Sequence, residues 1–359
     1  MLRPVPILSS LAGILMAAAG SCATACAQSP SPVLQVVATL PDYAFVARRI
    51  GGERVRVSAI VQGDQDAHFI RPKPSFVTLV ARADVLIGTG LDLELWLPTV
   101  IDRSGNRRVR SGQPGFVAAS HGVGLREKPA QLSRIEGGVH VYGNPHITSS
   151  PLNLRIAAHN IARGLCRNDE AGTPVYEAGL RAFVAELDER LFGAELVKLL
   201  GGDTLAQLAT KGTLLEFLGK NRFRGQPLLD SLGGWLGRMR PLRGTRLVTY
   251  HKNWVYFLEL FGLEEAGTVE PKPGISPTPG HVTGLVERMR EQGIKILLAA
   301  NYFDRQQVHT VAERVGAAPV IVPLYVGGAP GAEDYFALVD LWIDGLLGAA
   351  RRTGILAGE

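Results

Sequence analysis

The stretch RVRVSAIVQGDQDAHFIRPKPSFVTLVARADVLIGTG, residues 54–90, contains a complete strand–helix–strand unit. Its two ends, RVRVSAIV (54–61) and ADVLIGTG (83–90), are short apolar runs rich in valine and isoleucine, which is typical of strands. Between them, PSFVTLVARA (74–83) has the spacing of a helix and begins on proline. Strands joined through a helix pair in parallel, so this stretch predicts an α/β sheet covered by helices.

The same alternation extends over the rest of the chain. Two further strand-like runs precede residue 150, namely LQVVATL (34–40) and GFVAAS (115–120). Four more follow residue 244: TRLVTY (245–250), AGTVEP (266–271), KILLAAN (295–301) and APVIVPL (318–324). Helical patterns lie between them, and several of these end on glycine, as helices often do. We therefore predict an α/β fold with two lobes, each a mainly parallel four-stranded sheet flanked by helices.

A long amphipathic segment separates the two sets of strands. From Thr173 to Leu200, apolar residues recur at helical spacing, which predicts a spine helix of roughly 40 Å that joins the lobes. We predict a signal peptide at 1–27, an N-terminal lobe at 28–172, the linking helix at 173–200, a helical insertion at 201–244 and a C-terminal lobe at 245–359. The insertion is interpreted as a helical pad on one lobe, with a docking surface for a permease or metal donor as the alternative.

The composition is that of an exported globular protein. The 359 residues are 46% hydrophobic and 20% charged, which suffices for two packed cores. Arg3 precedes the apolar run PILSSLAGILMAAAG, and small residues follow it, which is typical of a secretory signal peptide. We expect a periplasmic protein, with a lipid anchor through Cys22 or Cys26 as the alternative.

Cysteine content and charge exclude several classes of protein. Without the signal peptide only Cys166 is certain to remain, so an internal disulfide framework is excluded. The net charge is +5, and its densest basic cluster, DRSGNRRVRSG (102–112), is interpreted as a solvated loop. No basic–aromatic interleaving supports nucleic-acid binding. We expect the chain to act as a monomer.

Four polar residues follow strands in the two predicted lobes. His68 follows the second strand, His146 the fourth, His251 the fifth and Asp304 the seventh. In open parallel sheets, ligands bind beyond the carboxyl ends of the strands, so facing lobes would bring these residues into one metal cleft. Three imidazoles and one carboxylate suit zinc and are tolerable for other divalent first-row metals. Spacing alone leaves metal binding open, because no HExxH or CxxC motif occurs.

Four longer stretches share a resemblance to one family. DAHFIRPKPSFVTLVARADVLIGTGLDLELW resembles the first signature of the metal-specific (zinc and manganese) substrate-binding proteins of ABC importers. GNPHITSSPLN, LVTYHKNWVYFLELFGL and EPKPGISPTPGHVTGLVERMREQGIKILLAANYFDR resemble the second, third and fourth signatures, in the same order. The resemblance implies that His68, His146, His251 and Asp304 are the metal ligands.

The resemblance also implies a function. It indicates an extracytoplasmic receptor that captures a divalent transition metal and delivers it to a cognate ABC permease, with a metal-donating chaperone as a further partner. Three histidines favour zinc as the metal, with manganese, which prefers more oxygen ligands, as the alternative. A zinc-dependent hydrolase is the competing class. Four protein ligands would leave no open position for a catalytic water, so we expect a carrier and not an enzyme.

The sequence also departs from the family pattern. Residues 148–150, Thr-Ser-Ser, replace the residues usual after Asn-Pro-His, and Ala300 replaces a common glutamate. Residues 102–143 offer only His121 and His140 where zinc-dedicated relatives often have a His-rich loop. We interpret His140 as a solvated loop residue, with a way-station for the metal as the alternative. We interpret Asp66 as a turn residue, with an outer-shell carboxylate as the alternative.

Overall fold

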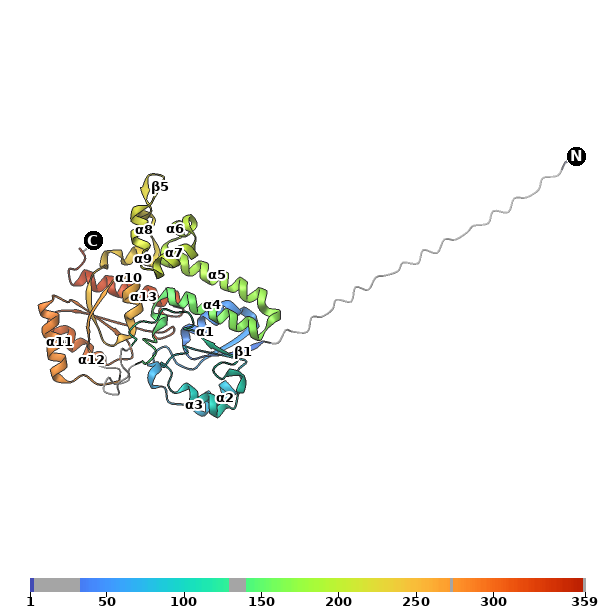
Figure 1. The fold of residues 1–359 in the computed structure, drawn as a ribbon, viewed down its shortest axis with the longest axis horizontal. Helices are drawn as coiled ribbons and strands as arrows, with labels where there is room; N and C mark the ends of the chain where they lie inside the picture. Colours follow the sequence, from blue (N-terminus) through green and yellow to red (C-terminus); the bar gives the residue numbers. More distant parts are fainter. Residues whose placement is uncertain (3–32, 129–139, 272–273, 358–359) are drawn as a thin grey trace. The chain divides into compact units, whose positions relative to one another are not determined.

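Two parallel four-stranded sheets form the framework of the chain (Figure 1). The computed structural model describes residues 1–2, 33–128, 140–271 and 274–357. The first sheet has the order β2-β1-β3-β4, with β1 Leu34–Ala38, β2 Val55–Ala59, β3 Val85–Gly88 and β4 Phe116–Ala118. The second has the order β10-β9-β7-β8, with β7 Arg246–Thr249, β8 Glu264–Thr268, β9 Ile296–Ala300 and β10 Ala318–Val322. The predicted fold class is confirmed.

Both sheets share one topology. In each, the chain runs outward in one direction from the first strand and then continues on the other side of it, so the order reverses between β1 and β3 and between β7 and β9. Such a reversal opens a crevice beyond the carboxyl ends of the strands, where open α/β sheets bind ligands. The predicted signal peptide at residues 1–27 lies outside the described residues, apart from Met1 and Leu2.

Helices cover both faces of each sheet. In the first lobe these are α1 Pro41–Gly51, α2 Pro74–Ala81, α3 Leu97–Ser104 and α4 Pro151–Asn168. In the second they are α10 Val255–Phe261, α11 Pro279–Glu291, α12 Arg305–Val315 and α13 Tyr335–Arg352. Strand β9 shows how the sequence achieves this: Ile296 and Leu298 face one core, and Leu297 faces another, formed with α11 and α12. Successive side chains of a strand point to opposite faces, so an unbroken apolar run serves both.

Short 3-10 turns complete the chain between the longer elements. They lie at Gly52–Arg54, Ala67–Phe69, Arg107–Val109, Ile147–Ser149, Glu170–Gly172, Leu228–Ser231, Arg240–Leu242 and Lys252–Trp254. No helix within the described ranges is both long enough and apolar enough to cross a membrane.

The spine helix α5 extends over Thr173–Phe192 and ends eight residues before the predicted Leu200. Gly193 follows it with φ of 89°, a conformation that interrupts the helix, and α6 (Ala194–Leu200) begins immediately afterwards. The Phe183 ring of α5 lies 6.2 Å from that of Phe45 in α1 and 5.8 Å from that of Phe336 in α13. The spine therefore packs against both lobes, and a single hydrophobic core continues between them.

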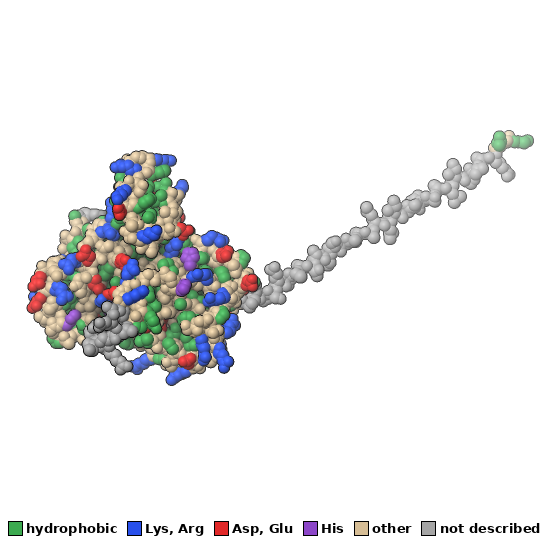
Figure 2. All heavy atoms as spheres, viewed as in Figure 1, with side chains coloured by type: hydrophobic (Ala, Val, Ile, Leu, Met, Phe, Trp, Pro, Cys, Tyr) green, Lys and Arg blue, Asp and Glu red, His purple; other side chains and the backbone are tan. Residues whose placement is uncertain are grey.

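The predicted insertion is made of short elements. They are α7 Gly202–Thr210, α8 Leu214–Lys220, β5 Arg222–Phe223, β6 Gln226–Pro227 and α9 Gly234–Met239. Trp235 is buried, and its Nε1 donates to Asp340 of α13 at 2.9 Å, which fixes α9 on the second lobe. The hairpin β5–β6 lies at the far end of α8 in Figure 1, and Figure 2 shows blue lysine and arginine side chains there.

We expect Gly164→Ala in α4 to destabilise the fold. A Cβ atom at Gly164 would lie 2.2 Å from Cγ2 of Val117, so α4 and β4 would have to separate. Overpacking of this kind costs about 1–3 kcal/mol of unfolding free energy. Gly219→Ala in α8 is the matched control, since a Cβ atom there meets nothing within 4 Å. Urea unfolding of both variants checks the prediction, and equal stability of the two would contradict it.

Candidate metal site

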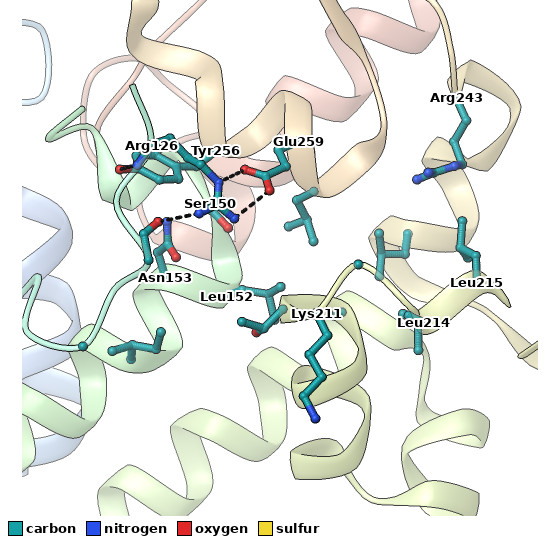
Figure 3. A pocket seen from close by; sticks show the side chains of 18 residues that line it. Arg126, Ser150, Leu152, Asn153, Lys211, Leu214, Leu215, Arg243, Tyr256 and Glu259 are labelled. Carbon is teal, nitrogen blue, oxygen red and sulfur yellow. Dashed lines mark hydrogen bonds and ion pairs between the residues drawn. The ribbon is translucent and has the colours of Figure 1, made fainter. Parts of the chain in front are cut away.

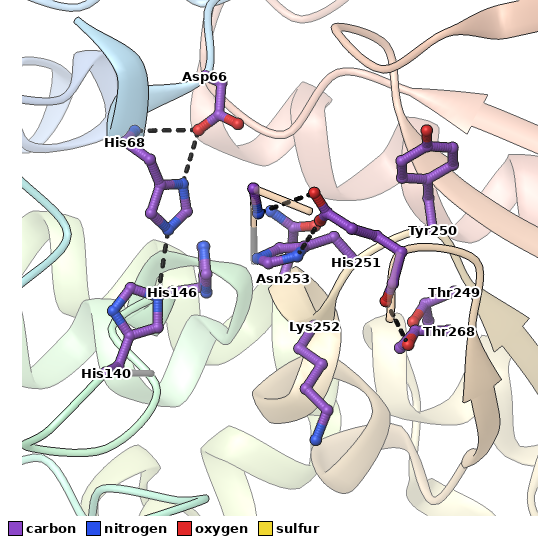
Figure 4. Close-up of polar contacts among 12 residues, drawn as sticks. Asp66, His68, His140, His146, Thr249, Tyr250, His251, Lys252, Asn253 and Thr268 are labelled. Atoms are coloured by element: carbon purple, nitrogen blue, oxygen red, sulfur yellow. Dashed lines mark hydrogen bonds and ion pairs between the residues drawn. The ribbon is translucent and has the colours of Figure 1, made fainter. Parts of the chain in front are cut away.

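Three histidines that are distant in the sequence meet at one point. His68, His146 and His251 each offer a ring nitrogen, and these three atoms lie within 4.8 Å of one another. The ring centroids are 5.0 Å apart for His68 and His146, 5.6 Å for His68 and His251, and 5.5 Å for His146 and His251. Figure 4 shows the rings directed toward each other from both lobes. The structure therefore brings together the three histidines predicted from the sequence.

His68 lies in a 3-10 turn, η2 (Ala67–Phe69), beyond the carboxyl end of β2. Oδ1 of Asp66 accepts from the backbone N–H of His68 at 3.0 Å and from its Nδ1 at 2.6 Å. Trp96 donates its indole N–H to the carbonyl of Ala67 at 2.8 Å and so ties the turn to the segment after β3. Asp66 orients the imidazole and leaves Nε2 directed into the cluster, which agrees with the alternative prediction of an outer-shell carboxylate.

His146 repeats this arrangement with an amide in place of the carboxylate. Oδ1 of Asn144 accepts from the backbone N–H of His146 at 3.0 Å and from its Nδ1 at 2.9 Å. The amide group of Asn144 donates to the carbonyl of Lys252 at 2.7 Å, and thus connects this loop to the second lobe. Both motifs, Asp-Ala-His and Asn-Pro-His, use the residue two positions earlier to fix the ring.

His251 comes from the second lobe, two residues after β7 ends. Its Nδ1 lies 2.6 Å from Oε2 of Glu270, and both side chains are largely buried. Glu270 follows β8, the neighbour of β7 in the sheet, and its Oε1 accepts from the backbone N–H of Gly274 at 2.9 Å. A carboxylate therefore fixes this ring too, although it comes from the segment after a different strand, β8.

The electrostatics of the cluster favour a cation. Since Asp66, Asn144 and Glu270 accept from the Nδ1 atoms, the Nε2 atoms of the three rings keep their lone pairs. His146 is 3% exposed, and its Nε2 is a buried polar atom that lacks a hydrogen-bond partner among the described residues. Burial, together with the neighbouring histidines, lowers the pKa of His146 well below its usual value and so favours the neutral, ligating form. Neutral imidazoles oriented by carboxylates are the donor arrangement of divalent metal sites.

Asp304 is not part of this cluster, contrary to the prediction. It is exposed and forms the N-cap of α12, where its Oδ1 accepts from the backbone N–H groups of Gln306 at 2.9 Å and Gln307 at 3.2 Å. The carboxylate satisfies the free amides of the first helical turn, which is a common role of aspartate directly before a helix. In this structure Asp304 has a structural role.

The sequence suggested that His140 is a solvated loop residue, but its side chain is largely buried. Its side chain is 13% exposed. Its ring centroid lies 5.2 Å from that of His68 and 5.7 Å from that of His146. The sequence offered little signal for it, because it lies in none of the predicted strands or helices. Asp92 and Glu270 were also missed, since their contacts with histidines depend on the tertiary fold.

The chain has a pocket elsewhere, shown in Figure 3. It lies between α4, the α7–α8 segment and α10, and the ion pair of Arg126 with Glu259, at 2.6 Å, lies on its wall. Apolar and polar side chains of both lobes line it, and none of the four clustered histidines does. Tyr256 also lines this pocket and donates its hydroxyl to the carbonyl of Asn144 at 2.6 Å.

These features define a class of protein: a two-lobed α/β receptor with an oriented histidine cluster between its lobes. Residues 36–191 and 231–349 match the family model described as "Zinc-uptake complex component A periplasmic", ZnuA. The chain belongs to this family of metal-binding substrate-binding proteins of ABC transporters, whose members are transport proteins and not enzymes. The hydrolase alternative is thereby set aside. The family match leaves out residues 192–230, which overlap the predicted insertion at 201–244.

Relatives and solved structures agree with this assignment. The chain is 22% identical over 296 residues to the manganese ABC transporter substrate-binding lipoprotein PsaA of Streptococcus anginosus, covering 81% of this chain and 78% of that relative. It is 23% identical to the iron ABC transporter substrate-binding lipoprotein MtsA of Streptococcus pyogenes, covering 93% and 94%. A zinc-bound ZnuA deletion mutant has the same fold, with a TM-score of 0.64 and 20% identity over 88% of this chain and 98% of that one.

We expect Glu270→Gln to weaken metal binding without removing a ligand. The amide cannot carry the negative charge that supports the Nδ1–H of His251, so the ring becomes less basic and less well oriented. Loss of such a partner typically costs roughly 10–100-fold in metal affinity. Competition with a chromophoric chelator measures the change, with Glu264→Gln, an exposed carboxylate on β8, as control. An unchanged affinity would show that Glu270 has no influence on the ring.

Proposed function

We propose that the chain is the extracytoplasmic receptor of an ABC importer and captures zinc with His68, His146 and His251. One observation carries this proposal: three imidazoles from both lobes present free Nε2 lone pairs at one point, and each has its Nδ1 bound by a separate partner. This arrangement removes the freedom of the rings before the ion arrives, which lowers the entropic cost of binding.

The donor set supports zinc over manganese. Imidazole nitrogen suits zinc and the later first-row metals, whereas manganese usually takes more oxygen ligands. The carboxylates near the cluster, Asp66 and Glu270, are each engaged by an Nδ1 atom, so they act as supports in this arrangement. Relatives are described as manganese and iron binding proteins, and the solved FpvC of Pseudomonas aeruginosa is described in complex with Mn²⁺. Because the relatives are described with different metals, the proposal of zinc rests on the ligands of this chain.

The setting follows from the family. A substrate-binding protein delivers its cargo to a cognate permease at the cytoplasmic membrane, and this chain would do so as a monomer in the periplasm, with a metal-donating chaperone as a further partner. The signal-like residues 1–27 support export. Some relatives are described as lipoproteins, so a form of this chain with a lipid anchor at Cys22 or Cys26 is the alternative.

Elemental analysis of the purified mature chain tests the proposal. After equilibration with equal concentrations of zinc and manganese, we expect one zinc per chain and little manganese. One manganese per chain would contradict the choice of metal. No bound metal at all would contradict the receptor function.

A further inference from the structure

A fourth histidine contacts the three-histidine cluster. Nε2 of His140 lies 3.2 Å from Nε2 of His68. Nδ1 of His140 lies 3.0 Å from Oδ1 of Asp92, and the other oxygen of this carboxylate accepts from the backbone N–H of Val141 at 2.8 Å. Figure 4 shows the ring of His140 directed at that of His68. One aspartate thus holds both the ring and the backbone beside it.

The contact between the two Nε2 atoms places two ring nitrogens face to face. Asp66 and Asp92 are carboxylates that accept from the Nδ1 atoms of His68 and His140, so both Nδ1 atoms carry the proton. In the neutral rings, the two Nε2 atoms are then both acceptors, and their lone pairs face each other at 3.2 Å. Two acceptors at this distance repel unless a positive charge lies between or beside them.

The separation also fits a shared metal ion. Two nitrogens bound to one tetrahedral zinc at 2.0–2.1 Å lie roughly 3.3–3.4 Å apart. The 3.2 Å between the Nε2 atoms of His68 and His140 is close to this edge length. His140 lies outside the group of nitrogens within 4.8 Å of one another, so its ring has to move toward His146 and His251 to share the ion. His140 also shares the feature that distinguishes the other three rings, an Nδ1 bound by an oxygen acceptor: Asp66, Asn144, Glu270 and Asp92 serve the four histidines in turn.

We propose that His140, and not Asp304, is the fourth ligand, so that four imidazoles bind the metal. This inference rests on the proposed receptor function and specifies the ligand set of the same site. His140 belongs to the first lobe, which then supplies three ligands, while the second supplies His251. Asp92 is a positioning residue that acts through His140.

A site of four imidazoles has its own selectivity. It offers only neutral nitrogen ligands, and therefore suits borderline divalent ions such as zinc, cobalt, nickel and copper. Manganese, magnesium and calcium prefer oxygen and lose the carboxylate that Asp304 would have supplied. Asp66, Asp92 and Glu270 each contact the Nδ1 atom of one histidine ring, and their negative charges compensate the charge of the ion.

The test compares His140→Ala with Asp304→Ala in the mature chain, using zinc alone as the probe. Zinc affinity is measured by chelator competition, and the number of imidazole ligands by X-ray absorption at the zinc edge. We expect His140→Ala to lower affinity by about 100-fold or more, since even the loss of a partner that only orients a ligand costs roughly 10–100-fold. The imidazole count should fall from four to three. Asp304→Ala should stay within about threefold of wild type.

Matched controls separate this inference from the receptor function. His159→Ala removes an exposed histidine of α4 and should change neither the zinc affinity nor the number of imidazole ligands. His140→Asn is the second variant in case alanine disturbs the segment, and thermal unfolding of the metal-free proteins confirms that each is folded. If His251→Ala loses zinc but His140→Ala binds as wild type with an unchanged count, the fourth-ligand inference is overturned while the receptor function stands. If Asp304→Ala lowers zinc affinity as much as His140→Ala does, the fourth-ligand inference is overturned as well. Zinc uptake that no histidine variant alters would contradict the receptor site itself.

Discussion

Replacing His251 with alanine is expected to lower zinc affinity by about 1,000-fold or more, beyond the loss caused by removing a supporting partner. The substitution deletes the one imidazole that the second lobe contributes to the cluster. It also leaves Glu270, whose side chain is 11% exposed, without the ring N–H that it binds at 2.6 Å. Glu270 keeps the backbone N–H of Gly274 as a donor, so the expected loss of affinity comes from the missing ligand. Chelator competition on the purified mature chain measures the effect.

Cys166→Ala is the control for this prediction. Cys166 is the free cysteine among the residues that the structure describes, and it packs partly buried in α4 against the core. Its thiol is expected to have no part in coordination, so this variant should bind zinc as the wild type does. A large loss of affinity in Cys166→Ala, or none in His251→Ala, would show that the ligands lie elsewhere.

The second large effect concerns Asp42, which joins the two lobes. This residue of α1 is fully buried, and its Oδ1 accepts from the backbone N–H of Val326, in the segment after β10, at 2.9 Å. Its Oδ2 has no hydrogen-bond partner within the part of the chain that the structure describes. Burial raises the pKa of Asp42 from 3.8 to about 7, although the hydrogen bond from Val326 and the nearby side chain of Thr148 oppose the shift.

The raised pKa predicts the pH dependence of stability. Between 3.8 and about 7 the carboxyl is protonated in the folded chain but ionised in the unfolded chain. The folded state therefore binds more protons, and its stability falls as the pH rises through this window. Asp42→Asn cannot ionise, yet keeps an acceptor for Val326. From pH 4.5 to pH 8, the variant should gain about 3 kcal/mol in unfolding free energy relative to wild type.

Urea unfolding of the metal-free proteins at the two pH values measures this gain. Asp64→Asn, which changes an exposed carboxylate, should show no comparable trend. If Asp42→Asn and the wild type keep the same difference in stability at both pH values, Asp42 is ionised in the folded chain and the buried contact between the lobes is of another kind.

The fold could be predicted because its signals are local. Apolar runs bounded by turn residues lie where the strands of the two larger sheets lie, apart from β8, and the unbroken apolar run of β9 indicates burial on both faces. The end of α5 was missed because apolar spacing continues beyond Gly193, and only the backbone angle of that residue reveals the break. Strand β8 lies at Glu264–Thr268, earlier than the predicted 266–271. Its alternation is weak there, so the sequence does not fix the register.

The site could be predicted only in part, for a physical reason. His68, His146 and His251 follow strands or lie in motifs that fix them locally, so their positions at the sheet edges can be inferred from the sequence. Asp304 precedes a helix, and the same residue type serves equally well as an N-cap. His140 depends on Asp92, 48 residues away, for its position. A contact of that span is set by the tertiary fold, and no local pattern reports it.

A crystal structure of the mature chain soaked with zinc, with an anomalous difference map at the zinc absorption edge, tests the central claim most directly. The account predicts one strong peak within about 2.0–2.1 Å of the Nε2 atoms of His68, His146 and His251. A peak bound elsewhere on the chain, or no peak between these three rings at full zinc occupancy in solution, would contradict it.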